Sequence, residues 1–535
     1  MATRTSLRYE DWSKEDLINH IRLLESKSSA SSQPKASPEK KRSLSKSSAR
    51  HRNPSPSHRA FHFSSHPRRK IALKFCYSGW KYNGLAYQLS PTPLPTVEEV
   101  LFDALAKARL IDPAAGYDGC EWEKCGRTDR GVSAAGQVVS LWVRSALLNA
   151  QDGSVDAPLE KESTTASTST EVTRAEAVDE DVGELEDGFG SLDIDDKDTP
   201  PHPTTTEPCS RPEHDYVAIL NRILPDSIRV IAWSPVSPSF SARFACKFRH
   251  YKYFFSSEHL DIPKMQDAAS RLLGDHDFRN LCKIDAGKQI TIFVRKILTA
   301  EIVPVEGDDT TTGMYVLNLV GTAFLYHQVR HIMAVLLLVG RGLEEPSIVT
   351  SLLNVHEGAE QVRPGEHLEV VDRKPEYQMA DALPLVLWDC GYSNEDVNWQ
   401  TSGHDIDAVE ATQASSGSND SGRGLYHLLH SIHARSQIFT TLHRHFLDAA
   451  SQFFGPPWAP TSNGQIGVRN GETVAWEVPL GGGASRKLAQ YVPLLKRNRL
   501  DTVETINERW RLGKGFRRDN RKWTAGDDEE DGGGE

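Results

Sequence analysis

The sequence has few cysteines, and they lack the spacing that marks a cysteine-rich site. Its 535 residues include seven cysteines, at positions 76, 120, 125, 209, 246, 282 and 390, and no two of them form a Cys-x-x-Cys pair. The odd number and the missing pairs argue against a disulfide framework and against a structural zinc site. They favour a reducing compartment, and we expect no metal in this protein.

Long apolar runs and nucleotide-binding loops are missing as well. The longest strongly apolar run, 332–339, is far shorter than the roughly 20 residues that a membrane-spanning helix needs. The first residues contain no apolar signal-peptide core. The glycine-rich stretch PLGGGASRK at 479–487 lacks the Gly-Lys-Ser/Thr ending of a phosphate-binding loop. We therefore expect neither a membrane contact nor a cofactor.

Charged residues are gathered in blocks, although the net charge is only −11. Residues 150–210 contain 17 acidic and 3 basic side chains, and residues 27–70 contain 12 basic and 1 acidic. Such segments bury too little apolar surface to offset the entropy lost on ordering. The basic block either contacts phosphates or is a solvated linker. Its clusters EKKR (39–42) and PRRK (67–70) resemble nuclear import signals, so we expect the protein in the cytoplasm, the nucleus or both.

These shifts in composition divide the chain into segments. The first segment, 1–26, contains a short amphipathic helix, whose apolar face needs a partner surface that the sequence does not identify. The predicted order is an N-terminal helix (1–26), a disordered basic arm (27–69), one half of the main domain (70–149), a disordered acidic insert (150–210), the other half of the main domain (211–393), a disordered insert (394–424), a helical C-terminal extension (425–515) and a disordered tail (516–535).

The periodicity of apolar residues predicts the elements of the main domain. Strands are expected over 69–79, 136–144, 226–236, 248–257, 294–305 and 313–324, and helices over 96–110, 262–274 and 325–342. This order indicates an α/β (α+β) protein with a mixed or antiparallel sheet. Two similar halves, broken near 145–215, agree with it, although no sequence repeat is evident.

The string GRTDRG, at 126–131, places a carboxylate between two guanidinium groups just before a predicted strand. Its two glycines permit backbone angles that other residues resist. Positive neighbours favour the ionised form of Asp129, which suits a nucleophile or a general base. A polar turn with a surface salt bridge explains the same residues, and this string alone does not decide between the two.

Basic and aromatic residues interleave in RFACKFRHYKYFF, at 243–255. On a strand, Arg249, Tyr251 and Tyr253 share one face. Aromatic rings can stack on exposed bases, and arginines can hold phosphates, which predicts a contact with nucleic acid. Tyrosines packed into a core are the alternative.

A third string, GTAFLYHQVRHIM at 321–333, places Arg330 inside an increasingly apolar helix. Buried arginines nearly always pair with a carboxylate, and the guanidinium group matches a carboxylate in bidentate geometry. We infer that Arg330 pairs with Asp129, although the two lie far apart in the sequence.

Together the three strings resemble the TruA-type family of tRNA pseudouridine synthases. In that family an aspartate follows a Gly-Arg-Thr triplet, as Asp129 does here. Tyr251 matches the first tyrosine of the family's Arg-x-Tyr-x-Tyr string, and Arg330 ends a Phe-x-x-x-x-Val-Arg string that begins at Phe324. In ALPLVLWDCGY, Leu385 matches an apolar position near the base.

The resemblance extends over roughly residues 70–145 and 212–393. The N-terminal helix, GDHDFRNLCKID at 274–285 and YVPLLKRNR at 491–499 resemble more narrowly the eukaryotic branch that modifies positions 38 and 39 of the tRNA anticodon stem-loop. The long inserts depart from the compact bacterial pattern, but they fall where loops are expected.

This resemblance implies a fold, a reaction and a set of roles. The fold is a central, mostly antiparallel sheet flanked by helices, in two pseudo-symmetric halves with a cleft between them. The reaction converts uridine in tRNA to pseudouridine without a cofactor. Asp129 is the implied nucleophile, Arg330 keeps it ionised and aligned, and Tyr251 stacks on the base.

The implied substrate-binding residues are Arg127, Arg249, Tyr253 and Leu385, with Arg127 holding the uridine out of its stack and Leu385 lining the apolar side of the pocket. Members of this family are often homodimers, which makes a homodimer the expected assembly. Two alternatives remain at this point: a non-catalytic RNA-binding or RNA-chaperone protein on the same fold, and a synthase for another site in tRNA or another RNA.

Overall fold

The computed structural model describes residues 61–147, 213–305, 313–401, 421–454, 465–466 and 475–516. The predicted N-terminal helix, the acidic insert, the acidic tail and most of the basic arm lie outside these residues. The chain divides into two compact units, Met1–Phe61 and His62–Glu535, and all elements described below belong to the second. Among the described helices, none has the length and apolar character needed to span a membrane.

Within the described residues, one large sheet forms the centre of the protein. Its strands are β1 (Arg68–Tyr77), β2 (Glu123–Lys124), β3 (Ser133–Arg144), β4 (Ile228–Pro235), β5 (Phe248–Ser256), β6 (Gly274–Asp277), β7 (Val294–Pro304), β8 (Met314–Gly321) and β9 (Leu385–Gly391). They lie in the order β4-β1-β3-β9-β5-β8-β7-β6, with β2 paired to β3. Neighbours run antiparallel except β3 and β9. The predicted mostly antiparallel sheet is therefore confirmed.

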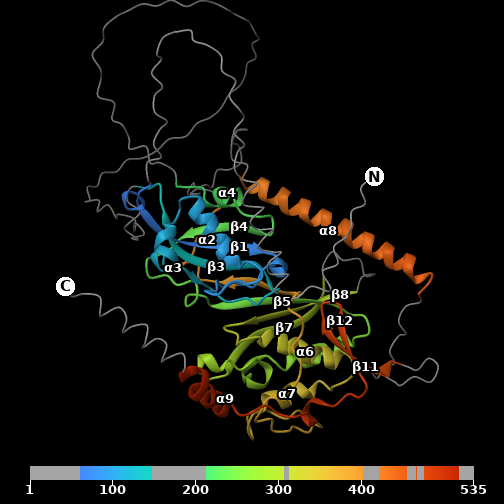
Figure 1. The fold of residues 1–535 in the computed structure, drawn as a ribbon. Helices are drawn as coiled ribbons and strands as arrows, with labels where there is room; N and C mark the ends of the chain where they lie inside the picture. Colours follow the sequence, from blue (N-terminus) through green and yellow to red (C-terminus); the bar gives the residue numbers. More distant parts are fainter. Residues whose placement is uncertain are drawn as a thin grey trace, which may run out of the picture. The chain divides into compact units, whose positions relative to one another are not determined.

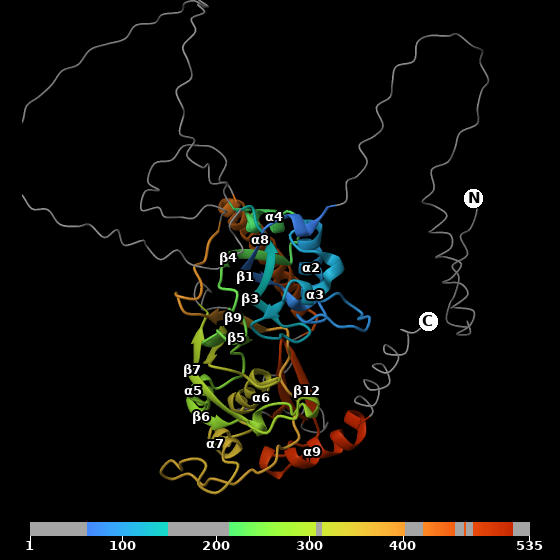
Figure 2. The ribbon, with the colours of Figure 1, turned by 90° about the vertical axis from the view of Figure 1, so that its left-hand side faces the viewer.

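The parallel pair of β3 and β9 joins the two halves of the sheet. Ser133 pairs with Val386 and Ala134 pairs with Leu387. On its other side β9 pairs with β5, where Leu387 is opposite Tyr251. Figure 1 shows β5 between the N-terminal strands and the C-terminal strands, and Figure 2 shows β9 beside it, on the side of β3. This arrangement places the turn that precedes β3 beside the first residues of β9 and the middle of β5.

The N-terminal half has its own hydrophobic core. Helix α2 (Val97–Lys107) begins at Thr96, whose hydroxyl accepts a hydrogen bond from the Glu99 N–H while the Glu99 carboxylate accepts one from the Thr96 N–H. This capping box fixes where the helix begins. Leu101 and Leu105 of α2 are fully buried and belong to the same apolar cluster as residues of β1, β3 and β4.

The C-terminal half is built around α6 (Gln328–Gly340), beside α5 (Ile262–Ser270) and α7 (Ser347–Leu353). Of the thirteen residues of α6, all but Arg330 are buried. The prediction of a helix over 325–342 placed its start too early, because His327 has a left-handed backbone (φ 59°) that cannot continue a helix. The helix predicted over 262–274 ends at Ser270, and Gly274 (φ 108°) begins β6 instead.

The C-terminal extension is only partly helical, so its prediction as a helical segment was wrong in part. It contains α8 (Ser421–Ser451) and α9 (Val503–Trp510) but also a second sheet of β10 (Gln465–Ile466), β11 (Ala475–Gly481) and β12 (Ala484–Leu488). Three consecutive glycines, 481–483, all have positive φ. Such angles allow a tight hairpin that other residues resist.

The disordered insert predicted at 394–424 was too long, because residues 394–401 and 421–424 lie in the described part of the chain and α8 begins at Ser421. Residues up to 401 are described, and Gln400 exchanges two backbone hydrogen bonds with Trp233 of β4. Because these bonds extend the edge of the sheet, residues 394–401 belong to the folded domain rather than to the insert.

The described residues on the two sides of the predicted acidic insert are held together. The Glu213 carboxylate accepts hydrogen bonds from Ser145 Oγ (2.6 Å) and from the Ala146 N–H (2.8 Å). It also pairs with Arg69 of β1 at 3.1 Å. These contacts hold Ser145, Ala146 and Glu213 together beside the start of β1 and the end of β3.

Deletion of residues 150–205 is expected to leave the protein folded, because the Glu213 contacts place the ends of the remaining short loop close together and closure of a short loop costs little free energy. Calorimetric melting of the deletion variant should give a melting temperature within a few degrees of the full chain. Glu213→Ala is the matched control and should melt earlier. Loss of a cooperative transition on deletion would show that the insert is part of the fold.

Candidate active site

A cleft of about 1050 Å³ lies at the junction of the two halves. It is lined by the segment before β3, the segment that leads into β5, the start of α6 and Leu385. Its wall is strongly basic, with eight basic side chains (Lys124, Arg127, Arg130, Arg243, Arg249, Lys288, Arg295 and Arg330) against three acidic ones (Glu123, Asp129 and Asp285). Such a surface favours a polyanion.

The turn that carries Asp129 is fixed on both sides. Thr128 is buried, and its hydroxyl is 2.6 Å from the Tyr77 hydroxyl of β1. The Val132 N–H donates to the Asp129 carbonyl at 3.1 Å. Gly131 has φ 85°, an angle that L side chains rarely adopt. The turn therefore presents the Asp129 side chain at one defined place in the cleft.

Two side chains of the α6 region hold the Asp129 carboxylate. Arg330 Nη1 lies 3.7 Å from Asp129 Oδ2, and His327 Nε2 lies 3.1 Å from the same oxygen. The inferred pair of Arg330 and Asp129 is therefore present. Asp129 keeps 27% of its side-chain surface exposed, against 12% for Arg330, so the carboxylate still faces the cleft.

The backbone explains why these two side chains reach the aspartate. Arg330 faces the cleft from a helix whose other residues are buried, and its Nε donates to the Ala380 carbonyl at 2.8 Å. His327 is directed by its left-handed backbone at the position before α6. Its Nδ1 is buried and has no hydrogen-bond partner in the described part of the chain. The ring is therefore held from its Nε2 side, by the aspartate.

His327 was missed in the sequence. It lies within the string FLYHQVR, but its role depends on a left-handed backbone, which histidine adopts too rarely for the sequence to predict it. The only signal was its place three residues before Arg330, which is a spacing that a helix would have put on the same face.

Tyr251 and Leu385 lie on the neighbouring strands β5 and β9, and both line the cleft. The Tyr251 ring packs edge-on against Phe324, with 5.0 Å between the ring centroids. Burial raises the pKa of Tyr251 well above its ordinary value, so the phenol is neutral at physiological pH. Leu385 is nearly fully buried and provides an apolar wall.

Tyr253 does not line the cleft, so its assignment to the substrate was wrong. It is on the same face of β5 as Tyr251, but it is fully buried, and its hydroxyl donates to the Asp381 carbonyl at 3.0 Å. The strand runs from the cleft into the core below α6, and Gly481 of the C-terminal hairpin packs directly against the Tyr253 hydroxyl. Tyr251 and Tyr253 therefore lie on the same face of β5, but only Tyr251 lines the cleft.

Arg249 lines the cleft, but its guanidinium group is already engaged. It donates to the backbone carbonyl groups of Cys125, Arg243 and Thr322, at 2.9–3.1 Å. Arg249 therefore ties together segments on three sides of the cleft. Its predicted contact with the substrate stays a prediction.

Arg127 and Arg130 flank Asp129, and both are exposed at the cleft. Neither forms an ion pair with any residue that the structure describes, and both remain available for a ligand. The cleft also presents two exposed aromatic rings that sequence reasoning did not single out. Phe244 is 77% exposed with Arg243 beside its ring, and Tyr326 has Lys283 and Lys288 at its ring.

Arg330→Ala is expected to lower the free energy of unfolding by about 2 kcal/mol, because it strands the Asp129 carboxylate and removes the hydrogen bond to Ala380. The double variant Asp129→Ala/Arg330→Ala should lose less than the sum of the two single variants. Urea unfolding of all three proteins measures this coupling. Strictly additive losses would contradict a direct interaction.

Comparison with known proteins agrees with this geometry. Residues 268–393 match the protein family described as tRNA pseudouridine synthase. The chain is 34% identical over 509 residues to the tRNA pseudouridine(38/39) synthase of Saccharomyces cerevisiae, an alignment that covers 94% of this chain and 91% of the yeast protein. It is 38% identical over 348 residues to the human protein of the same name, covering 64% of this chain and 59% of the human one.

A more distant relative is the tRNA pseudouridine synthase A of Methanosarcina mazei, which is 28% identical over 331 residues, covering 62% of this chain and 87% of that protein. The chain thus spans nearly all of the yeast relative and about three fifths of the human one. With this coverage, and with an aspartate-bearing cleft at the centre of a mostly antiparallel sheet, the chain belongs to the TruA-type family of tRNA pseudouridine synthases.

Proposed function

We propose that this protein is an isomerase that converts uridine to pseudouridine in the anticodon stem-loop of tRNA, at positions 38 and 39. The observation that carries the proposal is the Asp129 carboxylate, held by Arg330 and His327 at 3.7 Å and 3.1 Å and still open to a basic cleft. Relatives that are 34–40% identical to it over the aligned residues are named for these two positions.

The reaction requires little beyond positioning and one reactive carboxylate. The bond between N1 of uracil and C1′ of the ribose breaks, the base rotates, and a bond forms between C5 and C1′ as C5 loses its proton and N1 gains one. Atoms and electrons balance without an oxidant or an energy source. Asp129 begins the reaction by attack on the sugar or on the base, and both routes fit a carboxylate that faces the cleft.

The remaining residues of the cleft hold the base during this rotation. Tyr251 and Leu385 offer an aromatic ring and an apolar side chain on adjacent strands, which suits a flat, partly apolar base. Because burial keeps the Tyr251 phenol neutral, we assign it first to stacking and second to relay of the C5 proton through its hydroxyl. Phe324 fixes the orientation of the ring from the side.

The tRNA backbone requires a second set of contacts. The basic side chains of the cleft can neutralise phosphates. Such electrostatic contacts position RNA without reading its sequence. Arg127 is exposed beside the catalytic aspartate, where a guanidinium group can replace the uridine in its stack once the base has left the helix. The exposed ring of Phe244 and the ring of Tyr326 are suited to stack on unpaired bases near the target.

Asp129→Asn is expected to abolish pseudouridine formation and to leave tRNA binding within a few fold, because the amide keeps the shape of the carboxylate but loses its charge. The measurement is base-specific chemical mapping of pseudouridine in tRNA incubated with each protein, together with a filter-binding assay. Turnover of the variant near that of the wild type would rule out Asp129 as the nucleophile.

The same mapping locates the target. Signal at positions 38 and 39 is expected, and signal at another tRNA or RNA position would identify a synthase of different specificity. Binding of tRNA by the wild-type protein without any pseudouridine would favour a non-catalytic RNA-binding protein on this fold.

His327→Ala is expected to lower kcat about 10- to 100-fold with little change in KM, because it removes the ring whose Nε2 contacts the Asp129 carboxylate at 3.1 Å and so loosens the position of that carboxylate. His327→Gln, whose amide reaches about as far as the ring Nε2, should recover part of the rate. Single-turnover kinetics on saturating tRNA separates the two variants. Equal rates for wild type and both variants would remove His327 from the positioning of Asp129.

Two further proposals concern the whole protein. We propose a homodimer in which one tRNA contacts both subunits, since family members are often dimeric, and sedimentation of the purified chain would refute it by giving a monomer mass.

We also propose that the basic clusters at 39–42 and 67–70 direct part of the protein to the nucleus. A fluorescent fusion with both clusters changed to alanine should then shift to the cytoplasm, and an unchanged distribution would refute this.

A further inference from the structure

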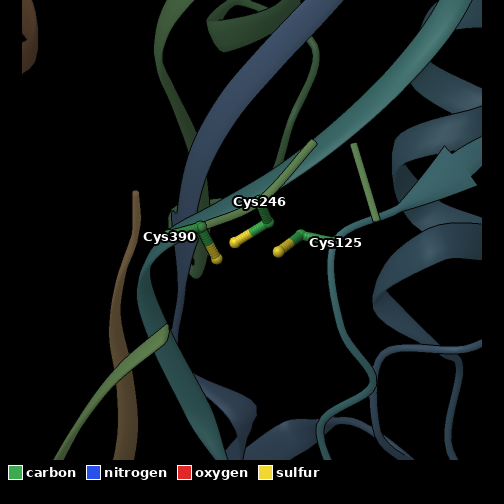
Figure 3. A group of neighbouring side chains, drawn as sticks. All are labelled: Cys125, Cys246 and Cys390. Carbon is green, nitrogen blue, oxygen red and sulfur yellow. The ribbon is translucent and has the colours of Figure 1, made fainter. Parts of the chain in front are cut away.

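Three buried thiols converge beside the cleft. Cys125, Cys246 and Cys390 are 2–8% exposed, none of them is in a disulfide, and their sulfur atoms all lie within 4.8 Å of one another. We call this group the thiol cluster. Figure 3 shows the three side chains directed toward one shared space from three different segments. The Cys246 thiol also donates to the Phe248 carbonyl at 3.1 Å.

The backbone around each thiol is fixed by the sheet, so the cluster is preorganised. Cys390 lies on β9 opposite Arg249 of β5. Cys246 lies just before β5, where the Lys247 N–H donates to the Gly391 carbonyl at 2.8 Å. The Cys125 N–H donates to the Val138 carbonyl of β3 at 2.9 Å. The cluster therefore connects β3, β5 and β9, the three strands at the junction of the two halves.

A positive charge lies beside the thiol cluster. The Arg249 guanidinium donates to the Cys125 carbonyl at 3.1 Å and lies against the cluster. A permanent positive charge is therefore next to the three sulfur atoms.

We propose that the thiol cluster binds one zinc ion through Cys125, Cys246 and Cys390. Tetrahedral zinc with Zn–S bonds of about 2.3 Å needs sulfur atoms about 3.8 Å apart, which small side-chain rotations from the observed spacing provide. Three thiolates and Zn²⁺ carry a net charge of −1, which the adjacent Arg249 offsets. Because Cys125 and Cys246 also line the cleft, water from the cleft is the fourth ligand.

A disulfide is the less suitable occupant of this group. It would use two of the three thiols, leave the third beside it and require an oxidant, whereas a thiophilic cation uses all three. The absence of Cys-x-x-Cys pairs, from which the sequence predicted no zinc site, excludes only ligands that are close along the chain. Strand pairing has brought together residues that lie more than a hundred positions apart.

The proposed ion acts as a staple for the active-site turn. Cys125 precedes Asp129 by four residues, and the ion ties it to β5, which carries Tyr251, and to β9, which carries Leu385. Metal bound only by the folded state stabilises that state by mass action. The ion is therefore expected to affect stability first, and activity only through the position of the turn.

The test is metal analysis of the full chain purified without chelator from zinc-supplemented medium. About one zinc per chain is expected for the wild type and for Cys76→Ser, a cysteine of β1 outside the cluster. Less than about a tenth of that is expected for Cys390→Ser, whose thiol does not line the cleft. In the wild type, a strong chelator should lower the melting temperature by several degrees, and zinc should restore it.

Substitution with Co²⁺ gives a second readout that does not depend on a folded variant. The wild-type protein should show the thiolate-to-cobalt absorption of a sulfur-rich tetrahedral site. Wild-type protein without metal and without a chelator effect, stoichiometric copper in place of zinc, or a disulfide among these cysteines by mass spectrometry would each overturn the proposal. None of these results depends on pseudouridine formation, so the zinc site and the proposed function can fail separately.

Discussion

The parallel pairing of β3 with β9 is the contact on which the active site depends. Elsewhere in the sheet neighbours are antiparallel, so this one pair joins two antiparallel halves that each have a separate hydrophobic core. The pair aligns the beginning of both strands at the same edge. The turn that carries Asp129 ends where β3 begins, and Leu385 is the first residue of β9. A slip of one residue in this register would turn Leu385 away from the cleft.

Helix α6 contributes the second constraint, through what it buries. Because every other residue of the helix is in the core, Arg330 has one direction left, toward the cleft. His327, directly before the helix, has a left-handed backbone. This conformation costs free energy for any residue other than glycine. A strained backbone of this kind persists where it gives a side chain a needed orientation, and here it directs the His327 ring toward Asp129.

The cleft separates residues that hold the protein together from residues that face the ligand. The Arg249 guanidinium group donates hydrogen bonds to backbone carbonyl groups, and the Tyr253 hydroxyl donates to another. Arg127 and Phe244 remain exposed at the same cleft. A rigid wall with a few free cations and rings fits a ligand that is bound mainly by charge and stacking, because such contacts tolerate small shifts of a flexible RNA loop.

The sequence by itself determined the parts of this protein that depend on local pattern. Alternating apolar residues located most strands of the sheet, and the strings around Asp129, Tyr251 and Arg330 identified the family and three members of the site. It could not separate Tyr251 from Tyr253, because two residues on one face of a strand differ only in what covers them. Strand β9 also escaped prediction, because its short apolar run is compatible with several structures.

Only the tertiary structure decided which distant residues meet. It placed His327 on Asp129 through a backbone angle that the sequence does not indicate, and it gathered the thiol cluster from three segments that sequence spacing had kept apart. Both depend on long-range strand register and helix burial, which are properties of the whole core. Residue types near one another in the chain limit the chemistry that is available, whereas the packing of the sheet decides which of those groups share a site.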